Sequence, residues 1–183
     1  TVFAKPLPTI TANDVISFCD GDSVELSTEM FTAYSWSSGE ASQAIKVKKA
    51  SSYTVTVTDA NGCKNTSAAT AVTVNPLPTP LISGPGSACE NASGYAYSVP
   101  NVAGHTYVWG ITGGAIATGA GTDKITVNWG ASGTGEFSIT ETITATGCTK
   151  DTTYTVNIST NLNPGVAAGG PLTFCEGNKV TLT

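Results

Sequence analysis

Five cysteines are the residues of this chain with the clearest capacity for chemistry. They are Cys19, Cys63, Cys89, Cys148 and Cys175. None forms a C-x-x-C pair. The chain has only one histidine, His105, which cannot complete the usual sets of cysteine and histidine ligands that bind zinc. The same shortage of imidazole argues against a catalytic thiol, which needs a nearby base. Disulfide bonds remain, and pairing in sequence order predicts Cys19–Cys63 and Cys89–Cys148.

The fifth cysteine belongs to a repeat. The pattern Phe-Cys-acid-Gly-x-x-Val-x-Leu occurs at residues 18–26 and again at residues 174–182, so Cys175 follows Cys19 by 156 residues. The chain therefore holds one period of two modules and the start of the next period. We expect the partner of Cys175 to lie beyond residue 183, which leaves this thiol unpaired by truncation.

Other residues offer little chemistry. Asp20-Gly21-Asp22 and Asp59-Ala60-Asn61-Gly62 each match only part of a calcium-binding EF-hand loop, and both have the composition of turns. A Ser-His-Asp site is not expected with His105 as the only imidazole. Glu136 and Glu141 share one predicted strand and do not flank a cleft as glycosidase carboxylates do. We predict no enzyme activity, no catalytic residue, no metal site and no cofactor.

Charge and hydropathy exclude two classes of partner. The net charge is -5 with only 8 Lys+Arg, and the cluster of Lys46, Lys48 and Lys49 is too small to neutralise a track of phosphates. Nucleic acid is therefore not an expected partner. No uninterrupted apolar run approaches the ~20 residues that span a bilayer, so membrane insertion is not expected either.

Short β-strands are the elements that must position the cysteines. Only 11% of the residues are charged, and long Thr- and Val-rich segments suit half-buried pleated strands. Tyr53, Val55 and Val57 alternate with threonines at the period of two that a sheet requires. Strands are predicted at 9–12, 23–27, 33–37, 44–47, 53–58, 67–74, 95–99, 106–111, 115–118, 124–129, 136–146 and 152–158. The sequence predicts an all-β chain of tandem sandwiches.

The same alternation predicts the core and one problem within it. Trp36, Trp109 and Trp129 all fall on the apolar face of their strands, which favours a core role over an exposed sugar-binding platform. Glu141 also falls on an apolar face. Because a buried unpaired carboxylate is costly, either a bulge redirects Glu141 or a donor such as Lys124 or a backbone N–H meets it.

Two sets of motifs carry a family resemblance. The first comprises Phe18-Cys19-Asp20-Gly21, Tyr34-Ser35-Trp36 and Asp59-Ala60-Asn61-Gly62-Cys63; the second comprises Tyr107-Val108-Trp109, Val127-Asn128-Trp129-Gly130, Gly133-Thr134-Gly135 and Gly147-Cys148. The first set resembles immunoglobulin-like (Ig-like) repeats of giant surface proteins in Bacteroidota. The second set resembles the PKD-like repeats of the same proteins.

Proline-rich segments divide the chain between these modules. Pro6-Leu7-Pro8 recurs as Pro76-Leu77-Pro78, and prolines at alternate positions form semi-rigid extended spacers. The predicted organisation is a linker at 1–8, an Ig-like sandwich at 9–75, a proline-rich linker at 76–80, a PKD-like sandwich at 80–160, and at 161–183 a linker with the truncated start of a further Ig-like repeat.

The resemblance also implies a location and a role. Such proteins are typically exported by type IX secretion machinery, and several are cell-surface adhesins, including mobile ones that drive gliding. We therefore expect an extracellular stalk whose partners are neighbouring repeats, with an extracellular glycan or surface protein bound elsewhere. Bacteria of this group O-glycosylate Asp-Ser/Thr sites, which implies modification at Ser23 and Thr152. Two alternatives stay open: a module that itself binds a glycan or protein, and an accessory segment of a secreted hydrolase.

Overall fold

The computed structural model describes residues 2–161, which form strands and loops and contain no helix, hence no helix that could cross a membrane. The first sandwich contains β1 (Thr11–Ala12), β2 (Ser17–Cys19), β3 (Val24–Ser27), β4 (Ala33–Trp36), β5 (Ala44–Val47), β6 (Ser51–Tyr53), β7 (Val55–Thr58), β8 (Lys64–Thr66) and β9 (Thr70–Asn75). The second contains β10 (Ser87–Cys89), β11 (Tyr95–Ser98), β12 (His105–Thr112), β13 (Gly114–Thr118), β14 (Lys124–Trp129), β15 (Gly133–Ile143) and β16 (Thr149–Ser159). Cys175 and the repeat at 174–182 lie outside the described residues.

The two sandwiches share one strand order. In the second, one sheet has the order β10-β16-β15-β12 and the other β11-β14-β13. In the first, β1-β3-β5 form one sheet, and β4-β7-β8 and β2-β9-β6 form the other side. Strands β6 and β7 are separated only by Thr54, and where β8 gives way to β9, Ser67 exchanges hydrogen bonds with Val55. With these pieces joined, β2-β9-β7-β4 matches β10-β16-β15-β12.

Two separate hydrophobic cores lie between the sheets. The first is built from ten buried residues between Phe18 and Val72, and the second from thirteen buried residues between Ile82 and Ile158. All three tryptophans are buried, as their strand positions predict. Packing against this core explains the second glycine of the motif Gly133-Thr134-Gly135. A Cβ at Gly135 would lie 2.2 Å from the Trp129 ring.

Three short strands, β2, β8 and β10, were not predicted from the sequence, and two of them, β2 and β10, carry a cysteine. Strand β2 pairs in parallel with β9, and β10 pairs in parallel with β16. Each has only three residues, too few for an alternating pattern to be recognisable. They matter because they place Cys19 and Cys89 beside the last strand of their sandwich.

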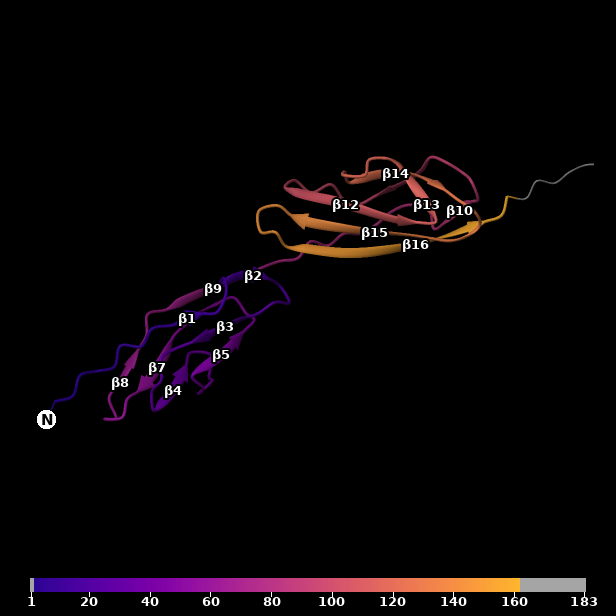
Figure 1. Ribbon diagram of the computed structural model, residues 1–183. Coiled ribbons are helices and arrows are strands. Elements are labelled where there is room, and N and C mark those ends of the chain that lie inside the picture. Colours follow the sequence, from indigo (N-terminus) through magenta and orange to yellow (C-terminus); the bar gives the residue numbers. More distant parts are fainter. Residues whose placement is uncertain (1, 162–183) are drawn as a thin grey trace, which may run out of the picture.

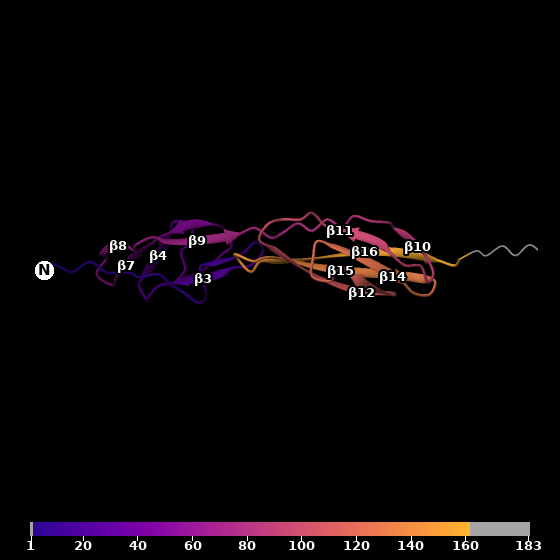
Figure 2. The same ribbon diagram turned by 90° about the horizontal axis from the view of Figure 1, so that it is seen from above.

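The sandwiches lie end to end. Figure 1 shows the first sandwich followed by the second along one direction, and the view turned by 90° in Figure 2 shows the same succession. The described chain starts at one extreme of this arrangement and leaves at the other. Each sandwich thus has an N-terminal end, where the chain arrives, and a C-terminal end, where it departs.

Separate cores predict separate effects of core mutations. Trp36→Ala should lower the free energy of unfolding of the first sandwich by about 3–5 kcal/mol, because it removes a buried aromatic ring. The second sandwich should keep its fold. Residue-resolved amide NMR spectra during denaturation measure the two sandwiches separately.

Met30→Ala is the matched control, because Met30 belongs to the same sandwich but is 83% exposed. Its effect should stay within about 0.5 kcal/mol. In the reduced protein, simultaneous loss of both sandwiches in Trp36→Ala at low denaturant would show that the cores do not fold independently.

Candidate functional site: the junction between the sandwiches

A disulfide bond joins the two sandwiches. Cys19 of the first is bonded to Cys148 of the second, with a Cα–Cα distance of 5.6 Å and a sequence separation of 129 residues. The predicted pairs Cys19–Cys63 and Cys89–Cys148 are therefore wrong, and Cys63 and Cys89 are free thiols. Cys19 and Cys148 remain disulfide residues, but with each other.

Cys19 is placed at the C-terminal end of the first sandwich by its parallel pairing. It is the last residue of β2 and lies opposite Asn75, the last residue of β9. The amide of Asp20 donates to the Asn75 carbonyl at 2.8 Å, and the amide of Asp22 donates back to the Cys19 carbonyl at 3.0 Å. Gly21, with φ at +98°, closes this turn. The turn interpretation of Asp20-Gly21-Asp22 is confirmed.

Cys148 is placed at the N-terminal end of the second sandwich by a hairpin. It is the last residue of the connection between β15 and β16. The amide of Ile143 donates to the Cys148 carbonyl at 2.9 Å, and Gly147 has φ at +73°. Cys148 is fully buried, although the hairpin residues before it are exposed.

The position of each cysteine explains why pairing in sequence order fails. Cys63 ends the β7–β8 hairpin at the N-terminal end of the first sandwich, whereas Cys19 lies at its C-terminal end, as the positions of β8 and β2 in Figure 1 show. A disulfide requires Cα atoms about 4.4–6.8 Å apart, which opposite ends of a sandwich do not provide. Cys89 and Cys148 are separated in the same way in the second sandwich.

The proline linker is fixed to both sandwiches. The Asn75 side-chain amide donates to the Ser17 hydroxyl at 3.1 Å and to the Phe18 carbonyl at 3.3 Å. On the other side, the Thr152 hydroxyl donates to the Pro80 carbonyl at 3.4 Å. Pro78 and Pro80 are buried and Leu77 is half-buried. Leu77 therefore lies partly covered at the junction, as expected for an apolar residue that docks the linker.

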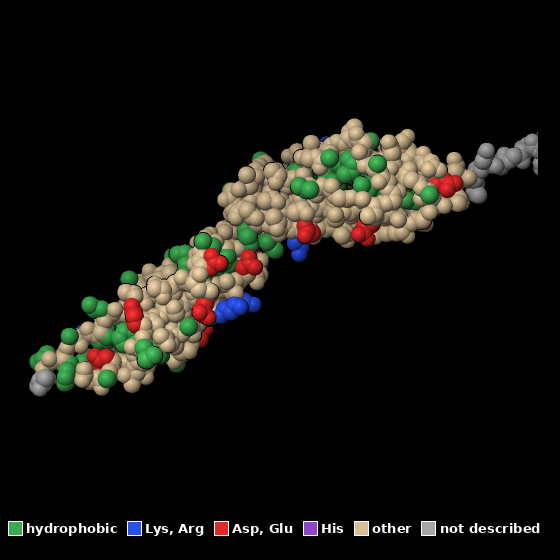
Figure 3. Space-filling model, in the orientation of Figure 1, with side chains coloured by type: hydrophobic (Ala, Val, Ile, Leu, Met, Phe, Trp, Pro, Cys, Tyr) green, Lys and Arg blue, Asp and Glu red, His purple; other side chains and the backbone are tan. Residues whose placement is uncertain are grey.

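A groove of about 580 Å³ lies beside the bond. Its lining includes Asp14, Asp22, Lys46 and Lys48 of the first sandwich together with Thr146 of the second. Lys46 in β5 and Lys48 directly after it are both exposed, and β5 is the edge strand of its sheet, which agrees with charged residues guarding that edge. Figure 3 shows basic and acidic side chains on both sides of this waist, on an otherwise largely uncharged surface. Charges of both signs in an open groove give no selectivity for one ion.

A hydrogen bond to a buried carboxyl group lies at the end of the second sandwich that faces the junction. Glu141 of β15 is buried, and its Oε1 lies 2.6 Å from Nδ1 of His105, the first residue of β12. Of the two expected solutions, a polar partner and not a bulge meets Glu141, since the strand pairing is regular on both sides of it. The partner is His105, and the suggested Lys124 is wrong because it lies in the opposite sheet.

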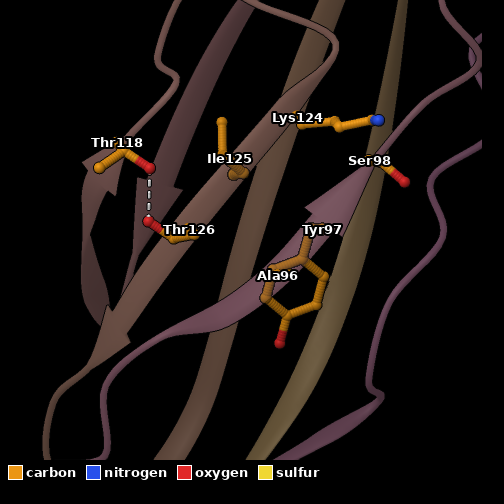
Figure 4. Close-up of a pocket in the computed structure, with 7 residues that line it drawn as sticks. All are labelled: Ala96, Tyr97, Ser98, Thr118, Lys124, Ile125 and Thr126. Atoms are coloured by element: carbon orange, nitrogen blue, oxygen red, sulfur yellow. Dashed lines mark hydrogen bonds between the residues drawn. The ribbon is translucent and has the colours of Figure 1, made fainter.

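A second hollow, of about 300 Å³, lies on the β11-β14-β13 sheet. Figure 4 shows that the Thr118 and Thr126 hydroxyls bond to each other, at 2.6 Å. The Tyr97 hydroxyl accepts from Trp129 Nε1 at 3.2 Å, and burial raises the pKa of Tyr97 above its ordinary value of 10.0. A phenol with a raised pKa stays protonated at neutral pH. The hollow thus offers Lys124 as its one charged group and no base.

The remaining candidate residues have structural partners. Asp59 caps its turn, because its Oδ1 accepts from the amides of Asn61 at 2.8 Å and Cys63 at 2.9 Å. Ser23 and Thr152, the expected O-glycosylation residues, are both half-buried at the junction, and this modification stays a prediction. Within residues 2–161, no group of three His, Cys, Asp or Glu side chains could hold a metal ion. A structural disulfide favours an oxidising, extracytoplasmic location.

The hydrogen bond between His105 and Glu141 makes a prediction for stability. His105→Ala leaves the buried Glu141 carboxyl group without its partner and should lower the free energy of unfolding by about 2 kcal/mol. The double variant His105→Leu/Glu141→Leu should be more stable than His105→Ala, because no buried polar side chain then lacks a partner. Denaturant unfolding measures both. Glu136→Ala, an exposed change in the same strand, is the control and should have an effect within about 0.5 kcal/mol; a double variant as unstable as His105→Ala would contradict the argument.

The disulfide should couple the melting of the sandwiches. When either sandwich unfolds alone, the bond closes a loop of roughly 60 residues, which costs about 4 kcal/mol in the chain-entropy model. When both sandwiches are unfolded, closing the loop of 129 residues costs about 5 kcal/mol in total. Unfolding of the second sandwich therefore adds only about 1 kcal/mol to the cost of loop closure. In calorimetry, the two midpoints should therefore lie closer together in the oxidised protein than in Cys19→Ser/Cys148→Ser.

The control for this prediction is Cys63→Ser/Cys89→Ser, which removes two thiols without removing the bond. Its two midpoints should equal those of the oxidised wild type. Equal midpoint separations in all three proteins would show that the bond does not couple the sandwiches.

Comparison with known proteins agrees with the second resemblance. Residues 75–158 match the family model of the PKD-like domain. A search of curated proteins found no match. The family model covers the second sandwich, and Ig-like and PKD-like modules commonly have structural or adhesive roles.

The solved structures that this chain matches are distant. Fibronectin(III)-like modules of Clostridium thermocellum CbhA are 10% identical, with a TM-score of 0.38 and coverage of 83% of this chain and 95% of that one. A marsupial T cell receptor is 12% identical, with a TM-score of 0.42 and coverage of 89% and 77%. Drosophila N-cadherin EC1-4 is 13% identical, with a TM-score of 0.35 and coverage of 86% and 50%. Likenesses at this level carry no functional argument. The second sandwich thus matches the PKD-like domain family, within a chain of tandem Ig-like β-sandwiches.

Proposed function

We propose that the two sandwiches are spacer modules in a tandem array on the outside of the cell, within the stalk of a surface adhesin. The array holds a distal region, which binds a glycan or a surface protein, away from the cell. The observation that carries this proposal is the Cys19–Cys148 bond across the junction. A bond in this position strengthens the connection between modules and adds no binding surface.

The path of the chain supports a spacer. The described chain begins at one extreme of the end-to-end arrangement and leaves at the other, so each module adds its length to the array (Figure 2). Modules with both termini at one end would not extend a stalk. The linker adds stiffness, because Pro76, Pro78 and Pro80 fix φ near -65° and restrict the residues before them.

The disulfide changes how force travels through the protein. A pull on the two ends of the described chain runs along the backbone to Cys19, crosses the bond to Cys148, and continues to residue 161. Residues 20–147 lie outside this covalent path. Even complete unfolding of both cores would therefore lengthen the protein by only the two short end segments.

Single-molecule pulling tests this function. The oxidised fragment should extend less than the reduced fragment by the contour of 129 residues, about 450 Å at ~3.5 Å per residue. Cys19→Ser/Cys148→Ser should extend fully without reductant, and Cys63→Ser/Cys89→Ser should behave as the wild type.

Two results would contradict the spacer proposal. One is full extension of the oxidised wild type, because the junction would then not carry load through its bond. The other is small-angle scattering from a compact particle with the sandwiches side by side.

Replacement of Pro76, Leu77 and Pro78 by glycine in the Cys19→Ser/Cys148→Ser background should broaden the distribution of dimensions toward compact shapes.

A further inference from the structure

We propose that Cys63 and Cys89 form disulfides with neighbouring modules, in the same way as Cys148 and Cys19. Cys89 bonds to the hairpin cysteine of the module that follows, and Cys63 bonds to the short-strand cysteine of the module that precedes. This inference rests on the tandem array of the proposed function and identifies the residues that join each module to the next.

Cys89 has the same backbone setting as Cys19. Each is the last residue of a three-residue strand that pairs in parallel with the final strand of its sandwich. Next to Cys89, the amide of Glu90 donates to the carbonyl of Ser159 at 2.9 Å, as the amide after Cys19 does to the end of β9. A residue with positive φ follows two positions later, Asn91 at 55°. Cys89 is exposed at the C-terminal end of the second sandwich.

Cys63 has the same backbone setting as Cys148. Each is the last residue of the hairpin before a returning strand, and each follows a glycine with positive φ, which is +80° at Gly62. The carbonyl of Cys63 accepts from the amide of Asp59 at 3.0 Å, as that of Cys148 accepts from the residue that ends β15. The backbone therefore presents both thiols at the N-terminal end of a sandwich.

The two free thiols cannot satisfy each other. Cys63 lies at the outer end of the first sandwich and Cys89 at the outer end of the second, so the whole end-to-end arrangement separates them, as the positions of β8 and β10 in Figure 1 show. A bond from either one must go to another module or another molecule.

An apolar residue at the free N-terminal end points to the same occupant. Pro6-Leu7-Pro8 is the counterpart of Pro76-Leu77-Pro78, and Pro8 is buried as Pro78 is. The Asn65 side chain also donates to the Pro6 carbonyl at 2.7 Å, so this linker is already docked on its sandwich. Leu7 is nevertheless 82% exposed, whereas Leu77 is half-buried at the occupied junction. A preceding module would cover Leu7.

The sequence identifies the kind of module that meets Cys89. The pattern at residues 174–182 repeats that at 18–26, so a module of the first kind begins after the second sandwich. Modules of the first kind carry their hairpin cysteine at the position of Cys63. The partner of Cys89 is therefore a cysteine of the Cys63 type.

The bond forms by ordinary thiol oxidation. Two S–H bonds break and one S–S bond forms, and the two electrons and two protons pass to a disulfide oxidoreductase, whose own disulfide becomes two thiols. The same oxidant class serves the Cys19–Cys148 bond. No further co-reactant is needed.

A fusion of this chain with itself tests the pairing. Residues 1–173 are followed directly by residues 18–160, which joins the two copies at the natural repeat of Phe18 with Phe174. Cys63 of the first copy and Cys89 of the second are changed to Ser. The fusion then has one Cys89, in the first copy, and one Cys63, in the second. After production in an oxidising compartment, peptide mapping without reduction should find Cys89 of the first copy bonded to Cys63 of the second.

The outcomes separate this inference from the proposed function. Free Cys89 and Cys63 in a fusion that retains Cys19–Cys148 would overturn the inference but leave the spacer function intact. Cys89→Ser in the first copy is the control, and it should leave Cys63 of the second copy reactive toward an alkylating agent.

The full-length protein supplies a second measurement that does not depend on the fusion folding. Non-reducing peptide maps of protein released from the cell surface should show Cys63 and Cys89 in bonds with cysteines of other modules. Recovery of either residue as an alkylated free thiol would overturn the inference.

Discussion

The Cys19–Cys148 bond is the constraint on which the arrangement of the two sandwiches depends. Each sandwich has its own core, and the linker alone would connect them at one point. The bond adds a second covalent connection beside the first, because Cys19 lies opposite Asn75, where the linker begins. A single connection allows rotation about backbone bonds, whereas two connections remove that freedom. The groove beside the bond is lined by residues of both sandwiches, so its shape depends on the two ends being held together.

The position of the bond also affects stability. Small sandwiches bury limited apolar surface and benefit from a cross-link. A cross-link within each sandwich would stabilise each one separately. A cross-link between them adds about 4 kcal/mol to the free energy of unfolding of the sandwich that unfolds first. It adds only about 1 kcal/mol to that of the other sandwich, because most of the entropy cost of closing the loop has by then already been counted. The two sandwiches thus behave more nearly as one cooperative unit although their cores share no residue. The His105–Glu141 pair lies at the same end as Cys148 and helps to hold the hairpin side of that end.

Most of the fold could be predicted from the sequence, but the site could not. Alternation in segments such as Tyr53–Thr58 located the long strands and placed the tryptophans correctly. The three-residue strands β2 and β10 have no detectable period, and their parallel pairing with distant strands is a long-range contact. Without these two strands, the sequence does not show at which end of a sandwich Cys19 and Cys89 lie. Only the order of the cysteines along the chain then suggests a pairing. A signal was nevertheless present: Phe18-Cys19 and Ala88-Cys89 occupy equivalent places in their modules, as do Gly62-Cys63 and Gly147-Cys148. One cysteine at each end of every module favours bonds between modules.

The same distribution of cysteines determines how an array would respond to load. In each period, the covalent path leaves the backbone at Cys19, returns at Cys148, and runs 27 residues to Cys175, the equivalent of Cys19. This segment has a contour of about 95 Å, against about 550 Å for the 156 residues of the period. It contains β16 and the next linker, so load at that second type of junction would act on β16 directly. A bond from Cys89 would share this load, because β10 pairs with β16 along the sheet edge and anchors the neighbour to the folded sandwich. Every junction would then have a linker and a disulfide in parallel, and neither kind of module would be the weaker point of the stalk.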